Sequence, residues 1–127
     1  MGKTKKRRSL AGLKREADRV FSLFIRQRDA AGSEMSSCVT CGTPKRWFDL
    51  DCGHFWKRTH LATRYDERNC NSQCTYCNHF RSGAEAEHAA YILKTYGREV
   101  FEELETLHRR VVKLSRQDYE YIIDKYK

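Results

Sequence analysis

The sequence CVTC at residues 38–41 and its partner CTYC at residues 74–77 bracket the segment that decides the fold. Each motif supplies two thiolates from one tight turn, and zinc accepts four such ligands in a tetrahedral arrangement. No apolar leader follows the basic start of the chain, so we expect a reducing compartment, which disfavours the alternative of a disulfide scaffold. The motifs therefore predict a structural zinc site. Its ligands would be Cys38, Cys41, Cys74 and Cys77.

Helical periodicity flanks this segment on both sides. Before it, apolar residues recur at three- and four-residue steps, which predicts an N-terminal helix over residues 10–31 with its basic side chains facing solvent. After Gly83 the same pattern predicts a helical tail over residues 84–127. Gly97 would break this tail, and Ser115 would start its last helix as the N-cap.

These patterns predict one mostly helical α+β domain over residues 10–127. Its centre would be a zinc-bounded core over residues 38–82, and a flexible basic arm over residues 1–9 would precede the domain. Within the core, residues 47–50 and 53–56 would pair as the two short strands of a hairpin. A chain of 127 residues suits one small hydrophobic core.

The charge of the chain points to a polyanionic partner. There are 25 lysines and arginines against 17 aspartates and glutamates, a formal charge of +8, and residues 83–127 contribute nothing to this excess. Nucleic acid is the commonest intracellular polyanion and is therefore the expected partner. No apolar run approaches the roughly 20 residues of a membrane-spanning helix, which argues against a membrane protein. We expect the protein to act in the cytoplasm.

A histidine and two asparagines lie between and directly after the cysteine motifs. His54 follows Asp49 and Asp51 in the sequence DLDCGHF, Asn69 comes fifteen residues later, and Asn78 follows the second motif. Hydrolysis of a phosphodiester needs a base near neutral pH, and we predict that His54 is this general base. It also needs a hard divalent cation such as Mg²⁺ or Mn²⁺, to which Asn78 would offer its amide oxygen.

The order of cysteine motif, histidine, asparagine, cysteine motif and asparagine resembles the zinc-bounded form of the His-Asn-His (HNH, ββα-metal) nuclease superfamily. Its phage junction-resolving members of the endonuclease-seven kind also have asparagine in the last position, where it binds the catalytic metal. A closer resemblance, over residues 10–126, is to the NinG/Rap family of recombination proteins of lambdoid phages. It rests on FIRQRD at 24–29, DCGHF at 51–55, RYDERNC at 64–70, CTYCN at 74–78 and Tyr96-Gly97 in the helical tail.

This resemblance implies a metal-dependent endonuclease acting on branched DNA, such as Holliday junctions, in phage recombination with phage or host recombination proteins. The implied core is a treble-clef-like ββα finger, in which Asn69 orients the loop that carries the histidine. Related nucleases place a carboxylate directly before the histidine, where this chain has Gly53. Side chains two apart on a strand share a face, so we expect Asp51 to complete the metal site, with Asp49 in reserve.

Further residues between the motifs have two interpretations each. Arg58 would contact the scissile phosphate, because guanidinium pairs with phosphate in a bidentate manner, or it is a solvated surface residue. Cys52 and Cys70 would pack as small buried hydrophobes. The alternative for these two cysteines is a second metal site shared with His60 or His79.

An alternative function explains the charge and the cysteines equally well. It is a zinc-bounded nucleic-acid-binding module without catalysis, in which His54 is a packed histidine and Asn78 a helix N-cap. The many helices around so small a core also favour a homodimer, because a two-fold dimer matches the symmetry of four-way DNA.

Overall fold

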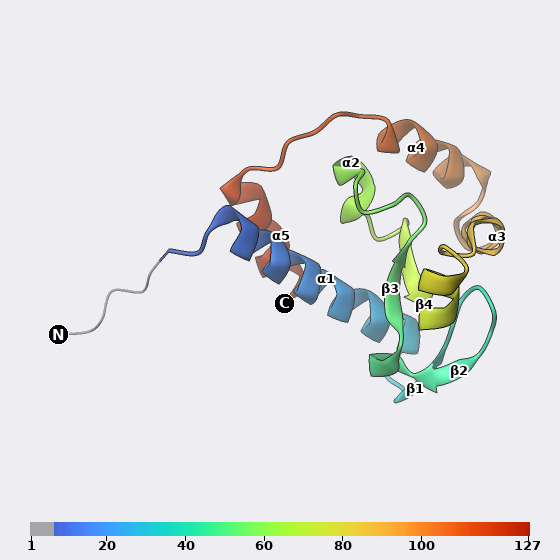
Figure 1. The fold of residues 1–127 in the computed structure, drawn as a ribbon. Coiled ribbons are helices and arrows are strands. Elements are labelled where there is room, and N and C mark those ends of the chain that lie inside the picture. Colours follow the sequence, from blue (N-terminus) through green and yellow to red (C-terminus); the bar gives the residue numbers. More distant parts are fainter. Residues whose placement is uncertain (1–6) are drawn as a thin grey trace.

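The computed structural model describes residues 7–127, so the first six residues of the predicted basic arm lie outside the described part of the chain. The longest element is helix α1 (Leu10–Ala30), which crosses the molecule (Figure 1). Ser9 caps this helix, because its hydroxyl accepts a hydrogen bond from the Gly12 amide at 3.0 Å. The helix ends where Ala31 takes a left-handed φ of 50°. The predicted N-terminal helix is therefore confirmed to within a residue.

The first cysteine motif lies in a small hairpin. Strand β1 (Met35–Ser37) pairs in antiparallel orientation with β2 (Pro44–Arg46), and the motif forms the turn between them. In this turn Gly42 takes a φ of +78°, a backbone conformation that residues with a side chain rarely adopt. Its amide donates to the Cys38 carbonyl at 2.8 Å. The tight turn expected for such a motif is therefore present.

The strand that carries the predicted general base has a different partner from the one we predicted. Strand β3 (Asp51–His54) runs antiparallel to β4 (Cys70–Gln73), in a register that places His54 opposite Cys70. The prediction that residues 47–50 and 53–56 pair as a hairpin is therefore wrong.

The chain bends immediately before β3, which explains this difference. Residues Trp47–Asp49 form the short 3-10 helix η1, closed by the Leu50 amide, which donates to the Trp47 carbonyl at 3.2 Å. The Leu50 side chain turns inward and packs among the zinc-motif cysteines. The connection from β3 to β4 contains helix α2 (Leu61–Arg64), and helix η2 (Tyr76–Phe80) follows β4.

Three helices form the C-terminal third of the molecule: α3 (Glu85–Tyr96), α4 (Arg98–His108) and α5 (Arg116–Tyr126). Gly97 separates the first two with a φ of 92°, and Ser115 caps the third through its side chain. Both predicted boundaries are confirmed. Across residues 7–127, no helix has the length and apolar character that a membrane span requires.

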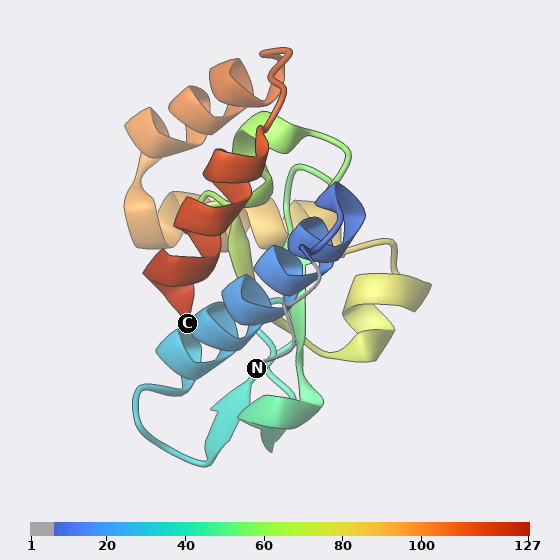
Figure 2. The same ribbon diagram turned by 90° about the vertical axis from the view of Figure 1, so that its left-hand side faces the viewer.

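Helices lie on both sides of the β3–β4 pair (Figure 1). On one side α5 lies along α1 (Figure 2), where the rings of Phe21 and Tyr126 have centroids 4.9 Å apart. On the other side, Phe55 packs against α3 and α4, its ring centroid 5.6 Å from those of His88 and Phe101. The hydrophobic core is thus divided between the two faces of a small sheet.

Two charged residues at the end of α1 fix β4 against this helix. The Arg28 guanidinium donates to the carbonyls of Glu67 and Cys70, both at 2.8 Å. The Asp29 carboxylate accepts from the Ser72 amide at 2.7 Å. These bonds satisfy backbone groups along β4, whose four residues are all buried. Because β3 pairs with β4, the same bonds also position β3 relative to α1.

Candidate metal centre and adjoining cleft

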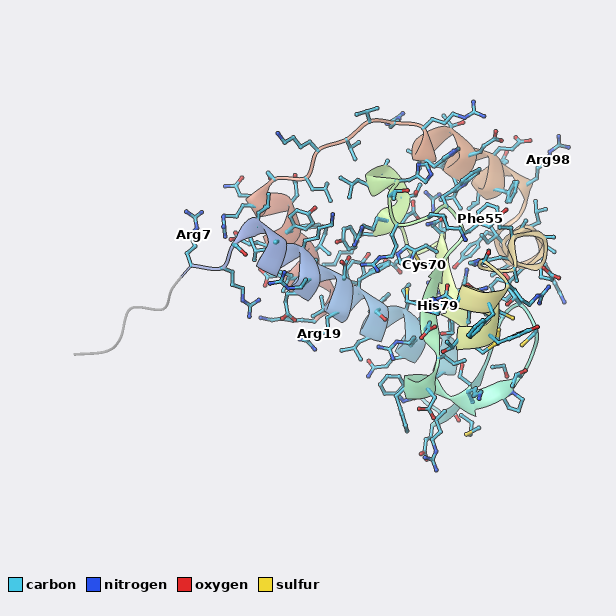
Figure 3. All side chains as sticks on the ribbon, viewed as in Figure 1. Arg7, Arg19, Phe55, Cys70, His79 and Arg98 are labelled. Carbon is cyan, nitrogen blue, oxygen red and sulfur yellow. The ribbon has the colours of Figure 1, made fainter. Side chains whose placement is uncertain are left out.

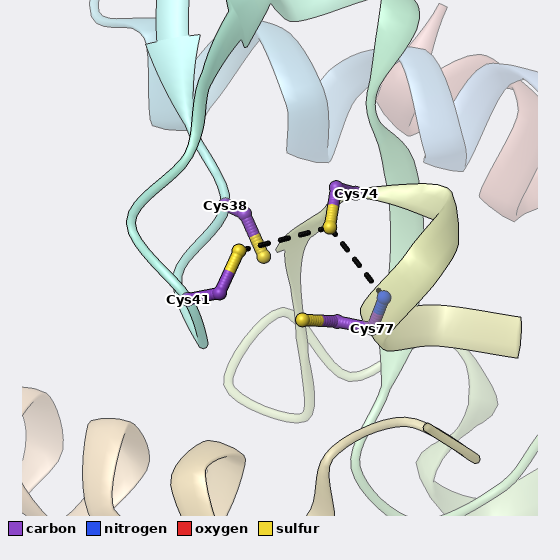
Figure 4. A group of neighbouring side chains, drawn as sticks. All are labelled: Cys38, Cys41, Cys74 and Cys77. Carbon is purple, nitrogen blue, oxygen red and sulfur yellow. Dashed lines mark hydrogen bonds between the residues drawn. The ribbon is translucent and has the colours of Figure 1, made fainter. Parts of the chain in front are cut away.

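The four cysteines of the two motifs converge on one point, as the sequence predicts (Figure 4). Their Sγ atoms all lie within 4.8 Å of one another, and those of Cys41 and Cys74 are 3.7 Å apart. Four zinc–thiolate bonds of about 2.3 Å in a tetrahedron separate the sulfurs by roughly 3.8 Å. The cluster can therefore hold a zinc ion.

Hydroxyl groups next to the sulfurs favour the thiolate form that zinc binds. The Thr40 hydroxyl lies 3.2 Å from the Sγ of Cys38. The Thr43 hydroxyl lies 3.0 Å from the Sγ of Cys41. Burial opposes ionisation of Cys38, but hydrogen bonds from Thr40 and from backbone amides outweigh it and lower the pKa of this thiol to about 6. The neighbouring hydroxyl and amide groups thus favour metal binding in addition to the four cysteine ligands.

The four-cysteine cluster also fixes Asn78. The Asn78 backbone amide donates to the Cys74 carbonyl at 2.9 Å, and the adjacent Cys77 is fully buried. Asn78 lies inside η2, whose N-cap is Thr75, so the helix-cap interpretation is wrong. Its side-chain Nδ2 donates to the Asp51 Oδ2 at 3.2 Å. The structure therefore brings together the two residues that we predicted as ligands of a catalytic cation.

A second side chain of η2, the imidazole of His79, also lies near Asp51. The Nε2 of His79, labelled in Figure 3, lies 3.6 Å from the same Oδ2 that accepts from Asn78. Asp49, the reserve carboxylate, lines the neighbouring cleft. Within residues 7–127, no side-chain hydrogen bond joins Asp49 to Asn78. Geometry thus places Asp51 and not Asp49 beside the asparagine.

His54 ends β3 and, being three residues from Asp51 on a strand, points to the opposite face. Its Nε2 donates to the Arg64 carbonyl at 2.9 Å, so Nδ1 carries the free lone pair. Burial, reinforced by the positive charges of Arg58 and Arg64, lowers the pKa of His54 to about 4. The ring is therefore neutral at pH 7, as a proton acceptor must be.

A cleft of about 440 Å³ lies between α1 and β3, and both Asp51 and His54 line it. Arg58, which follows β3, reaches across the cleft to α1, where its Nη2 lies 2.9 Å from the Asp18 Oδ2. The Arg58 side chain is still 59% exposed. The cationic residues of the lining are Arg15, Arg19, Arg26 and Arg58. The cleft thus combines a neutral imidazole, carboxylates and guanidinium groups.

An ion pair that the sequence did not predict supports this cleft. Asp18 of α1 accepts hydrogen bonds from Arg64, at 2.6 and 2.9 Å, and from the Tyr65 hydroxyl at 2.7 Å. The side chain of Arg64 is only 8% exposed, and its carbonyl is the one that fixes the His54 ring. Asp18 follows the fully buried Ala17 on α1. A carboxylate beside the apolar face of a helix is the signal that predicts such a buried partner.

Asn69 fixes the loop that follows His54. It is fully buried. Its Oδ1 accepts from the Trp56 amide at 2.9 Å, and its Nδ2 donates to the carbonyls of Trp56 and Thr63 at 3.0 and 3.2 Å. These hydrogen bonds to the backbone of Trp56 and Thr63 hold the loop in one orientation. An effect of Asn69 on catalysis stays a prediction.

The remaining cysteines lie on the α1 side of the sheet. Cys70 is fully buried in the core next to α1 (Figure 3), and Cys52 packs against the same cluster while partly exposed. Cys70 is therefore buried as predicted, whereas Cys52 packs against the same core but is only partly buried. Within residues 7–127, neither His60 nor His79 belongs to a metal-type cluster with them. The side chain that does is His54, with one ring nitrogen within 4.8 Å of both sulfurs.

Comparison with known proteins gives a consistent result. A family model described as "Bacteriophage Lambda NinG protein" matches residues 2–127. The protein called "Protein ninG" of Escherichia phage 933W is 34% identical over 101 residues, covering 76% of this chain and 46% of its own length. Those of Escherichia phage lambda and Salmonella phage P22 are each 33% identical over 101 residues, covering 76% of this chain and 45% of their own lengths.

The chain thus spans somewhat less than half the length of the curated relatives that it matches. No solved structure matches it. The family model, by contrast, covers almost every residue from the basic start to the end of α5. This chain therefore belongs to the NinG family.

Proposed function

We propose that this chain is a metal-dependent DNA endonuclease of the His-Asn-His (ββα-metal) type, which hydrolyses phosphodiester bonds in branched recombination intermediates such as Holliday junctions. The observation that carries the proposal is the cleft between α1 and β3. His54, which is neutral, and Asp51, which accepts a hydrogen bond from Asn78, both line this cleft together with four arginines. Membership of the NinG family supports a role in phage recombination.

His54 would take the proton of the attacking water. Donation of Nε2–H to the Arg64 carbonyl leaves Nδ1 free and fixes the orientation of the ring. The same carbonyl would stabilise the imidazolium that forms when the proton arrives. Since its pKa is lowered to about 4, the base would stay in its neutral form well below neutral pH.

Asp51 and Asn78 fit a hard divalent cation. Mg²⁺ prefers oxygen ligands and often uses one or two from protein, with water and substrate phosphate completing its shell. Asp51 offers a carboxylate, and a half turn of the Asn78 amide would bring its Oδ1 to where Nδ2 now lies. When bound, Mg²⁺ or Mn²⁺ would supply charge stabilisation for the scissile phosphate and the leaving oxygen.

Arg58 would bind a phosphate at the mouth of the cleft. Its side chain is largely exposed, and Asp18, its partner on α1, keeps two other donors in Arg64 and Tyr65. Arg58 can therefore exchange this carboxylate for a phosphate without leaving a buried charge unpaired. The basic residues at the start of the chain, which precede the described part, would add contacts to the DNA backbone.

A cleavage assay tests this proposal. Labelled four-way junction, splayed fork and plain duplex would be incubated with the protein and Mg²⁺ or Mn²⁺, alongside His54→Ala, Asn78→Ala and the control His60→Ala. We expect metal-dependent cuts in the junction that both cleft variants lose and the control keeps. Tight binding of junction without any cut in either metal would contradict the proposal and favour the non-catalytic zinc-bounded binding module.

Two further proposals accompany the nuclease. We infer that the protein acts as a homodimer, because two sites related by a two-fold axis could cut opposing strands of a four-way junction. We also infer that it works in the cytoplasm of the bacterial host, with phage or host recombination proteins as partners. A monomeric mass by light scattering, with and without junction DNA, would contradict the dimer.

A further inference from the structure

We propose that Cys52, His54 and Cys70 form a second metal site, suited to Zn²⁺, whose occupancy withdraws the histidine from catalysis. The site is separate from the four-cysteine cluster, because none of its three residues belongs to that cluster. Metal binding itself depends only on the three side chains. Its effect on hydrolysis rests on the nuclease function proposed above.

The strand register brings the three side chains together. Cys52 and His54 are two residues apart on β3 and therefore share a face, and His54 lies directly opposite Cys70 on β4. Both sulfurs and one imidazole nitrogen lie within 4.8 Å of one another. Tetrahedral zinc needs donor separations of roughly 3.3 to 3.8 Å, so the three groups need to approach one another by about 1.5 Å at most.

The donor set and the charge also suit zinc. Two thiolates and one imidazole are ligands that Zn²⁺ prefers over the oxygen-binding Mg²⁺. Zinc with two thiolates is neutral overall, so a filled site adds no net charge beside the buried Cys70. The two thiol protons would leave to solvent as the metal binds.

The surroundings provide access and orientation. Cys52 and His54 line the cleft between α1 and β3, so a metal ion can enter from solvent and a water can take the fourth position. The Arg64 carbonyl accepts the Nε2–H of His54 at 2.9 Å. Zinc-bound histidines usually donate their second ring nitrogen to such a group, which orients the ring and raises its affinity for metal.

A disulfide between the two cysteines fits the register less well. Cys52 lies opposite Ser72, and Cys70 lies opposite His54, so the two cysteines are diagonal neighbours. Diagonal residues of an antiparallel pair are roughly 7 to 8 Å apart. Disulfides usually join Cα atoms separated by about 4.4 to 6.8 Å. A metal ion bridges the two sulfurs, so they do not need to approach to the distance of a covalent bond.

Occupancy of this site would compete directly with catalysis. Nδ1 is the nitrogen of His54 that carries the free lone pair, and it is also the atom that would accept the proton of water. A lone pair that binds zinc cannot accept a proton. Zinc would therefore inhibit hydrolysis without displacing the divalent cation at Asp51 and Asn78.

The test is metal stoichiometry on the full chain, reduced and loaded with Zn²⁺ and then passed through a weak chelator. We expect two zinc ions per wild-type chain by mass spectrometry of the metal, and one in Cys52→Ala and in Cys70→Val. The ion retained by both variants, with an unchanged circular dichroism spectrum, would show that they are folded. The control His60→Ala should keep two ions.

Substitution with Co²⁺ gives a second measurement. The absorbance that arises from cobalt–thiolate bonds should fall by roughly a third in Cys52→Ala, because four of six cobalt-bound sulfurs then remain. A single ion in the wild-type chain, a disulfide between Cys52 and Cys70 in its place, or loss of the second ion in His60→Ala would each overturn the proposal.

Zinc inhibition then separates this site from the proposed nuclease. If junction DNA is cut in Mg²⁺, added Zn²⁺ should suppress the cuts by the wild-type chain at least tenfold more strongly than those by Cys52→Ala, which keeps His54. Equal suppression of cleavage in the wild-type chain and in Cys52→Ala would show that zinc does not inhibit hydrolysis through this site. If no cut appears in any metal, the nuclease proposal fails while the stoichiometry still decides whether the metal site exists.

Discussion

The two faces of β3 are held in place by different means. On one face Asp51 contacts Asn78, whose helix η2 contains Cys77 of the four-cysteine cluster. On the other face His54 is placed by hydrogen bonds, through the Arg64 carbonyl and the loop that Asn69 fixes, and by the ring of Phe21 on α1. The proposed metal half of the site, Asp51 and Asn78, would thus depend on zinc bound by the four cysteines, and the proposed base half, His54 and its loop, depends on buried polar groups. The half with Asn78 should therefore respond most to the removal of zinc, and the half with His54 should respond most to the loss of buried polar groups.

Zinc removal should have the largest effect. Structural zinc contributes on the order of 10 kcal/mol to the folding of small domains. A strong chelator should therefore lower the melting temperature steeply, as followed by circular dichroism, and one equivalent of Zn²⁺ should restore it. Hydrogen exchange should rise first in residues 38–41 and 74–80 and last where α1 packs against α5. An unchanged melting temperature after verified depletion would contradict the dependence of η2 on zinc.

Substitution of Asn69 should have the next largest effect. Asn69→Ala leaves the Trp56 amide and the carbonyls of Trp56 and Thr63 without their partner in a buried site. Buried groups left without partners cost about 1 to 3 kcal/mol each, so we expect a loss of about 3 to 4 kcal/mol in urea denaturation. The matched variant Asn78→Ala removes one partly buried bond to Asp51 and should cost less than about 1 kcal/mol. Equal losses would contradict the contrast between the two faces.

The stability of the base half should also depend on pH. The pKa of His54 is about 4 in the folded chain, below its ordinary value of about 6.5, so the unfolded chain binds more protons between these values. Stability should therefore fall as the pH drops from about 6.5 to 4 and level off below. The contribution of His54 is about 2 to 3 kcal/mol over this range. His88 titrates in the same direction.

Comparison of variants isolates the two histidines. His54→Gln should remove about half of the acid-induced loss, measured as the free energy of unfolding in urea at pH 7 and pH 4.5. His88→Gln should remove a comparable part, since its pKa is also lowered to about 4, chiefly by burial. A wild-type pH dependence that survives unchanged in His54→Gln would show that this ring is solvated in the folded chain.

The parts of the fold that follow from local sequence could be predicted. Cysteine spacing predicted the four-cysteine cluster, and apolar periodicity with Gly97 and Ser115 predicted the long helices, although not the short helices η1, α2 and η2. The position of Asn78 directly after Cys77 was enough to place it beside the metal centre, because a residue next to a zinc ligand has little freedom. Asp51 was preferred over Asp49 because side chains two apart on a strand share a face and Asp51 lies two residues before Gly53, although the predicted strand itself did not include Asp51.

The partner of β3 could not be predicted because its cause is not local. The sequence CNSQ at residues 70–73 is short and polar and lacks the pattern of a strand. It becomes a buried strand because Arg28 and Asp29, some forty residues earlier, bind its backbone. For the same reason the alternative of a second metal site at Cys52 and Cys70 was given His60 or His79 as its histidine, since only the register of this pair brings His54 to the two cysteines.

Arg58 should have the smallest effect on stability and a distinct one on DNA binding. Its ion pair with Asp18 is exposed, and such pairs contribute about 1 kcal/mol or less, so Arg58→Ala should melt nearly as the wild type does. If Arg58 binds a phosphate, its loss should reduce the slope of log affinity against log salt by about one. Fluorescence anisotropy with labelled junction at several salt concentrations measures this slope.

The control is Arg98→Ala at the start of α4, where the arginine pairs with Glu102 far from the cleft (Figure 3). The variant loses the same charge, so any general effect of net charge on binding appears equally in both. A slope that changes only in Arg58→Ala would place the DNA backbone along the cleft, within reach of His54. Equal slopes would mean that DNA approaches another surface, and His54 would then be a packed histidine and not a catalytic base.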